Sequence, residues 1–134
     1  MSWICPKCNR SFKLEDQWHS CVKVSIEDHF KNRPSVRPIF DLIYQRFIDK
    51  DKIRIEAVKN SILFKAPSVF LTVKVKKDHL ELEPILKEPF EEFPVYKTFR
   101  YSKNKVIHHI AVYDEEDLDE IVWRLLDESY ELTK

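Results

Sequence analysis

Three cysteines and one histidine near the N-terminus have the side chains and the spacing of a zinc site. Cys5 and Cys8 are separated by two residues, and His19 and Cys21 complete the group. Thiolate sulfur and imidazole nitrogen are the donors of structural zinc sites, where four protein ligands leave no open position for water or substrate. We therefore expect these residues to hold one structural Zn²⁺, and we expect no catalytic metal.

Two other roles are open to these cysteines: a redox-active pair, or a disulfide with one thiol left over. The neighbouring histidine favours metal binding. The sequence begins without an apolar signal segment, which favours a reducing, cytoplasmic location. Residues 1–24 are therefore expected to form a zinc-binding head. A segment this short cannot bury a sufficient core alone and would fold only with the metal bound.

The composition favours one soluble domain behind this head. The chain has 134 residues, of which 43% are hydrophobic, and glycine is absent. No run approaches the roughly 20 apolar residues of a membrane helix. The absence of glycine excludes glycine-rich phosphate loops, dinucleotide fingerprints and nucleophile elbows. Turn positions with positive φ are then expected to fall to asparagine or aspartate, and the main candidates are Asn9, Asn32, Asn60 and Asn104.

Helical periodicity marks two main segments. Apolar residues recur at three- and four-residue steps between Pro34 and Asp49, which predicts a helix, and Ser25 predicts the cap of a shorter one before it. Asp114 and the acidic residues after it predict the start of a last helix, because carboxylates favour the first turn. The expected buried stripe of that helix is Leu118, Ile121, Val122, Leu125 and Leu126.

A period of two marks the strands between these helices. Residues 53–83 and 98–113 alternate apolar and polar side chains and have short links, which predicts antiparallel hairpins. Three prolines predict a loop over residues 84–96. Residues 25–134 are therefore expected to form a two-layer α+β domain, with an antiparallel sheet of five or six strands flanked by two helices.

The sheet face away from the helices is the candidate binding surface. If Ile62 and Phe64 point inward, then Lys65, Phe70, Thr72 and Lys74 point outward, and Arg100 of the last hairpin can join them. Cations interleaved with an aromatic ring on a sheet fit phosphates and bases. The alternative is an ordinary half-solvated sheet, where lysines alternate with valines for solubility alone.

Adjacent histidines on the last strand point to opposite faces of the sheet. We expect one of His108 and His109 near the core with a hydrogen-bond partner, and the other on the outer face. The sequence places no carboxylate or nucleophile beside either, so no catalytic residue is assigned and a non-enzymatic role is favoured. The candidate ligand-binding residues are Lys65, Lys74, Arg100 and His109.

Charge is unevenly distributed although the net charge is zero. Residues 1–78 contain 16 Lys/Arg and 9 Asp/Glu, whereas residues 111–134 contain 2 and 9. The acidic end has a plain explanation as the solvated face of a helix. The basic part favours a zinc-containing binding module whose candidate partners are nucleic acid and another protein, with no membrane partner.

Two other functions stay open. A small-molecule-binding protein or enzyme would use a cleft between the sheet and loop 84–96, lined by Lys74, Arg100, Tyr101 and His109. A structural or oligomerisation role would use an apolar patch on the same loop, formed by Phe90, Phe93 and Tyr96. The sequence fixes no oligomeric state.

The chain also resembles a known family. Residues 3–8, Phe12 and residues 17–21 resemble the N-terminal zinc segment of some members of an uncharacterised bacterial family, domain of unknown function family 5655. The body resembles that family over residues 36–40, 56–65, 108–112 and 116–119. The resemblance implies an α+β fold with a helix-flanked antiparallel sheet, and it implies no activity. This chain has Asn9 and Val22 where the zinc segment usually has glycine.

Overall fold

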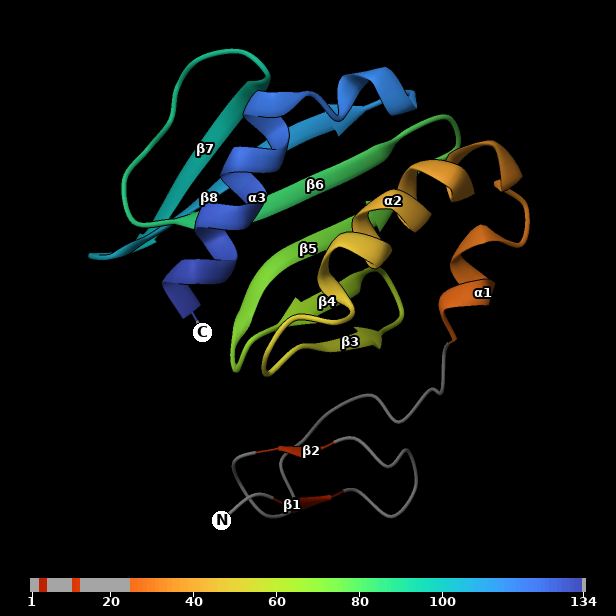
Figure 1. Ribbon diagram of the computed structural model, residues 1–134, viewed down its shortest axis with the longest axis horizontal. Helices are drawn as coiled ribbons and strands as arrows, with labels where there is room; N and C mark the ends of the chain where they lie inside the picture. The colour runs from red at the N-terminus through yellow and green to blue at the C-terminus, as the bar shows by residue number, and fades with distance from the viewer. Residues whose placement is uncertain (1–2, 5–10, 13–24, 134) are drawn as a thin grey trace.

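The computed structural model (Figure 1) describes residues 3–4, 11–12 and 25–133 of the chain. The four predicted zinc ligands lie outside these residues. Within the N-terminal part, β1 (Trp3–Ile4) pairs antiparallel with β2 (Ser11–Phe12). The fold that can be described in full is therefore that of residues 25–133.

Two short helical segments and one longer helix open the domain. Helix α1 (Ile26–Phe30) begins at a capping box in which the Ser25 hydroxyl accepts from the Asp28 backbone N–H at 3.2 Å, and the Asp28 carboxylate accepts from the Ser25 N–H at 3.0 Å. A 3₁₀ turn (Pro34–Val36) leads into α2 (Arg37–Phe47). The predicted cap and helix are confirmed.

The sheet has six antiparallel strands in the order β3-β4-β5-β6-β8-β7. The strands are β3 (Arg54–Ala57), β4 (Ile62–Lys65), β5 (Val69–Val75), β6 (Leu80–Leu86), β7 (Val95–Ser102) and β8 (Lys105–Val112). Strand β8 returns between β6 and β7, so β7 lies at an edge. This confirms the predicted α+β fold with an antiparallel sheet.

The predicted loop over residues 84–96 is too long. Strand β6 continues through Pro84 to Leu86, and β7 begins at Val95, so the connection is residues 87–94. Proline lacks the N–H that a sheet ladder uses. Residues 83–84 of β6 are not paired with β8, so a proline without an N–H can be accommodated at position 84 although β6 is an inner strand.

The last helix begins later than the sequence suggested. Asp114 caps a 3₁₀ turn (Glu115–Asp117), in which its carboxylate accepts from the Glu116 N–H at 2.9 Å. Helix α3 (Glu120–Thr133) starts after a second polar residue, Asp119, whose carboxylate accepts from the Val122 N–H at 3.0 Å. The two capping carboxylates thus belong to two consecutive segments.

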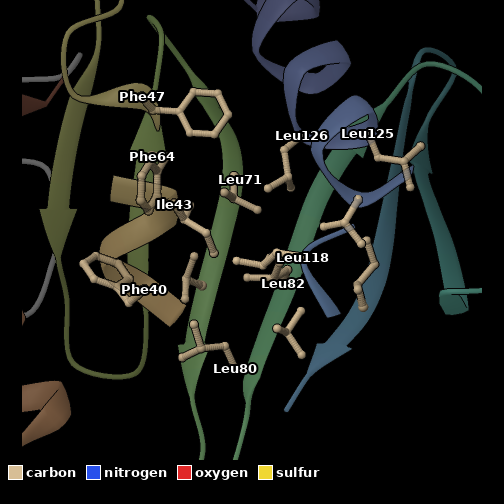
Figure 2. Packing of buried hydrophobic residues seen from close by; sticks show 14 of the residues in the cluster. Phe40, Ile43, Phe47, Phe64, Leu71, Leu80, Leu82, Leu118, Leu125 and Leu126 are labelled. Atoms are coloured by element: carbon tan, nitrogen blue, oxygen red, sulfur yellow. The ribbon is translucent and has the colours of Figure 1, made fainter. Parts of the chain in front are cut away.

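The core lies between the sheet and the two longer helices, which cover the same face (Figure 1). Figure 2 shows Phe40, Ile43 and Phe47 of α2 packed toward β4 and β5, and Leu125 and Leu126 of α3 on the same side of the sheet. Among the described residues, no helix is long and apolar enough to cross a membrane.

Phe70 belongs to this core, so its predicted outward orientation is wrong. The register between β4 and β5 shifts at Phe64/Lys65: Phe64 pairs with Leu71, whereas Lys65 pairs with Val69. Phe70 is the extra residue of this β-bulge and is fully buried, with its ring centroid 5.3 Å from that of Phe47. Bulges break strict alternation, and no residue pattern in this segment indicates one.

Turn chemistry also differs from the expectation. Within the described part of the chain, the residue with positive φ is Lys52, at 62°, in the turn before β3. Asn32, Asn60 and Asn104 have other conformations. Asn9 lies outside the described residues.

Candidate functional site

The outer face of the sheet is defined by strand alternation. On β8, Val106, His108, Ile110 and Val112 are buried toward the helices, so Ile107, His109 and Ala111 point the other way. Cross-strand partners share a face, which places Glu81, opposite Ala111, on this outer side. The adjacent histidines therefore face opposite sides of the sheet, as predicted.

The structure brings three of the four predicted ligand-binding residues to this face. Lys65 forms an ion pair with Glu56 (Nζ to Oε2, 2.8 Å), and Lys74 forms one with Glu83 (3.1 Å). Their charges are thus partly balanced by neighbours on the sheet. Arg100 lies opposite Val106, whose side chain is buried on the helix side, so Arg100 is not grouped with the others.

His109 belongs to a polar cluster around Glu81. The Tyr96 hydroxyl donates a hydrogen bond to Glu81 Oε1, and His109 Nδ1 lies 3.8 Å from the same oxygen. His79 Nε2 lies 3.6 Å from Oε2. Glu81 is only 7% exposed, and this burial raises the pKa of its carboxyl, against the lowering effect of the two histidines.

Two further contacts hold His79 in place, a ring stack and a hydrogen bond. Its ring stacks on Tyr113, with centroids 4.7 Å apart and planes at 23°. Its Nδ1 lies 2.7 Å from Asp78 Oδ1, and this hydrogen bond lowers the pKa of Asp78. The cluster thus joins residues from β6, β7, β8 and the turn before β6. Glu81 was not singled out from the sequence, and no sequence signal joined it to Tyr96.

Exposed aromatic rings surround this cluster. Tyr96 is 62% exposed, Phe99 56% and Tyr113 57%. Phe99 lies opposite Ile107 and so faces outward. Tyr96 and Lys97 lie opposite His109 across a bulge, and the bond to Glu81 shows that Tyr96 also reaches the outer face. Large exposed rings in one region mark an interaction surface more often than scattered ones do.

The helix side carries a different feature, a groove of about 1400 Å³ between α3 and the beginning of the β6–β7 loop. Its lining residues are Arg46, Leu86, Lys87, Glu88, Pro89, Phe90, Glu120, Ile121, Trp123, Arg124, Leu125, Asp127, Glu128, Glu131 and Leu132. A cleft near loop 84–96 was an expectation from the sequence. Its expected lining residues, Lys74, Arg100, Tyr101 and His109, do not border this groove.

The other histidine of β8 anchors the loop that borders the groove. His108 is fully buried; its Nε2 accepts from the Phe90 N–H at 2.8 Å, and its Nδ1 lies 3.0 Å from the Val106 carbonyl oxygen. Burial lowers the pKa of His108, which favours the neutral ring that can accept from Phe90. This confirms the expected core histidine with a partner.

The predicted metal ligands Cys5, Cys8, His19 and Cys21 lie outside the described residues, so their prediction stands as made. Within residues 3–4, 11–12 and 25–133, no group of His, Cys, Asp and Glu side chains is arranged to hold a metal ion.

Comparison with known families decides the classification of the domain. The family model described as "Domain of unknown function (DUF5655)" matches residues 26–133. The chain belongs to this family. Searches of curated proteins and of solved structures give no match. The DUF5655 match begins at α1 and ends with α3, so it contains both the outer face and the groove and leaves the predicted zinc head outside.

Proposed function

We propose that this DUF5655 protein is a non-enzymatic, zinc-containing module that binds single-stranded nucleic acid on the outer face of its sheet. The observation that carries the proposal is the grouping of exposed rings, Tyr96, Phe99 and Tyr113, around half-buried histidines and lysines on one face. The zinc head is part of the proposal because of its ligand spacing and its cations, Lys7, Arg10 and Lys13.

Stacking explains why a single strand fits this face. Unpaired bases expose their flat surfaces, and stacking on a protein aromatic ring contributes about 1–3 kcal/mol per base. Sheet surfaces with two or three exposed rings bind single-stranded RNA in this way. A duplex keeps its bases stacked inside, so exposed rings on a sheet offer it little.

The charges of the face favour phosphate. The carboxylates of Glu56 and Glu83 are paired with Lys65 and Lys74, and burial favours the neutral form of Glu81. Lys97 on the edge strand is exposed and faces outward beside His109. Lysines at such positions hold the phosphate backbone of a nucleic acid in place and make its affinity dependent on salt concentration.

The test is fluorescence anisotropy of the full chain with a labelled 12-nucleotide oligothymidine and with a DNA duplex of the same length. The single strand should bind more tightly, and its affinity should fall as salt rises. Phe99→Ala should weaken binding about 5- to 100-fold, as expected for the loss of one stacked base.

The matched control is Leu42→Ala, which removes an exposed apolar side chain from α2, on the other side of the sheet. It should leave the affinity unchanged. If the single strand does not bind even at low salt, or if both variants weaken binding equally, the outer face is not a nucleic-acid site. Equal affinity for the duplex would mean that charge alone, and not stacking, binds DNA.

A further inference from the structure

The groove on the helix side has two exposed apolar side chains on α3 that the core does not use. Ile121 is 37% exposed and Leu132 is 41% exposed, although both lie on α3, whose other face packs on β5 and β6. Ile121 was expected in the buried stripe of this helix, and the structure corrects that expectation. With half-buried Trp123 and Phe90, these side chains form an apolar surface between α3 and the loop.

The rim of the groove is predominantly acidic. Five carboxylates line it (Glu88, Glu120, Asp127, Glu128 and Glu131) against three cations (Arg46, Lys87 and Arg124). Three of these carboxylates already have cationic partners: Arg46 Nε donates to Asp127 at 3.0 Å, Arg124 Nε lies 3.9 Å from Glu128, and Arg100, outside the groove, lies 3.9 Å from Glu88. Counted with Arg100, five carboxylates face four cations, so the rim keeps a small excess of negative charge.

The helix backbone adds to this negative charge. The last turns of α3 contain Glu128 and Glu131. Within the described residues, its final turn has no basic residue. The C-terminus of a helix carries a partial negative charge, which favours cations there and disfavours carboxylates by about 0.3–1 kcal/mol each. A cationic side chain from a partner would offset this repulsion.

We propose that this groove binds a basic, amphipathic segment of a partner protein. Apolar side chains of the segment would lie on Ile121, Trp123 and Leu132, and its Lys or Arg side chains would meet the carboxylates of α3. The groove exceeds the roughly 300–1,000 Å³ of ordinary small-molecule pockets, which fits a peptide better than a metabolite. Recognition by apolar anchors and a charged rim is the usual way in which grooves hold such segments.

The probe is a synthetic 18-residue peptide with Leu and Lys at helical spacing, and the comparison peptide carries Glu in place of every Lys. Each is titrated into ¹⁵N-labelled full-length protein, followed by NMR. The basic peptide should bind saturably and shift the Trp123 indole and α3 resonances, whereas the acidic peptide should not bind. A shift confined to outer-face residues, or no binding of the basic peptide at low salt, would overturn the proposal.

Two variants separate the apolar and the charged contributions. Ile121→Ala with Leu132→Ala removes exposed side chains and should weaken binding about tenfold or more. Glu128→Gln with Glu131→Gln should weaken it about threefold, while the same change at exposed Glu115 and Glu116, outside the groove, should leave it unchanged. Equal loss in both charge variants would mean unspecific attraction and would overturn the proposal.

Sedimentation velocity addresses self-association through the same surface. The wild-type chain should remain monomeric, because the groove is proposed for a different protein. A dimer that the Ile121→Ala, Leu132→Ala variant abolishes would show that a second copy of this chain fills the groove, and the proposed partner would then be wrong.

Discussion

The outer face of the sheet and the groove on the helix side differ in the balance between their carboxylates and their cations. On the outer face each paired carboxylate has a lysine on the next strand, such as Lys74 with Glu83, and Glu81 is buried among histidines. Around the groove, carboxylates outnumber cations. The zero net charge of the chain is therefore the sum of an outer face whose charges are largely paired and a groove whose rim has more carboxylates than cations.

The two surfaces also differ in their aromatic side chains. Tyr96 and Phe99 project from the sheet with more than half of their surface exposed. Trp123, in contrast, lies half-buried beneath Arg46, whose guanidinium carbon is 4.7 Å from the ring centroid. Exposed rings suit flat stacking partners, whereas a covered ring suits the floor of a groove. Composition alone therefore does not assign a binding role to an aromatic residue.

Removal of zinc should produce the largest effect and should separate the two surfaces. The full chain should contain one zinc ion by mass spectrometry, and Cys8→Ser should lose it, because structural zinc sites contribute about 10–16 kcal/mol of binding free energy. The head carries cations, so oligothymidine affinity should fall in this variant while binding of the basic peptide persists.

Ser20→Ala, a change beside the predicted ligands, is the matched control and should keep both the metal and the affinity. A chain that contains no zinc in either form would end the prediction of the head. Zinc that remains bound after Cys8→Ser would show that Cys8 is not a ligand.

A fall in pH from 7.5 to 5.5 should act on the groove side through His108. Burial lowers the pKa of His108 below its usual 6.5, so the unfolded state binds a proton more readily than the folded state. Stability is then full above about pH 6.5 and is lost as the pH falls below it, by up to about 1.4 kcal/mol per pH unit. Urea denaturation at pH 7.5 and 5.5 measures this loss, which should be smaller in His108→Gln.

His109→Gln is the matched control, because it changes the adjacent histidine on the other face. It should retain the loss that His108 causes. The protonated ring can no longer accept from the Phe90 N–H, so NMR signals of residues 87–94 should move first on acidification. Equal pH dependence in His108→Gln and the wild-type chain would contradict this role of His108.

Periodicity was sufficient to predict the layers of the fold, because burial of an apolar stripe determines where helices and strands form. The opposite orientations of His108 and His109 followed from alternation alone. Alternation failed at Phe70, where a bulge turned an expected outer residue into the core. Bulges depend on contacts between strands, which the sequence order does not display.

The candidate surfaces were predictable only in part. Lys65 and Lys74 were assigned to the outer face from their strands together with one of the two adjacent histidines, and the structure places Lys65, Lys74 and His109 there. Glu81 and Tyr96 meet because β8 returns between β6 and β7, a topology that local patterns do not reveal. For the groove, the sequence indicated a cleft beside loop 84–96 but not its second wall, α3, which is distant from that loop along the chain.

The smallest expected effect concerns the buried carboxyl of Glu81 on the outer face. Burial raises the pKa of its carboxyl, so this residue contributes stability below the unfolded value of about 4.5 and loses that contribution as the pH rises through the folded value. Because burial disfavours the charged form, ionisation of Glu81 near pH 7 costs stability in this poorly solvated place. Glu81→Gln keeps the shape and removes the charge, so it should raise the free energy of unfolding at pH 7 by less than about 1 kcal/mol and change it least near pH 4.

Glu83→Gln provides the control, because the same change there breaks the ion pair with Lys74 and should not stabilise the chain. Urea midpoints of both variants at pH 4 and pH 7 give the comparison. Oligothymidine binding adds a second measure: with one carboxylate fewer beside Tyr96, Glu81→Gln should bind slightly more tightly at pH 7. If Glu81→Gln lowers the free energy of unfolding, relative to the wild type, more at pH 7 than at pH 4, then the ionised Glu81 carboxylate stabilises the folded chain and the prediction is wrong.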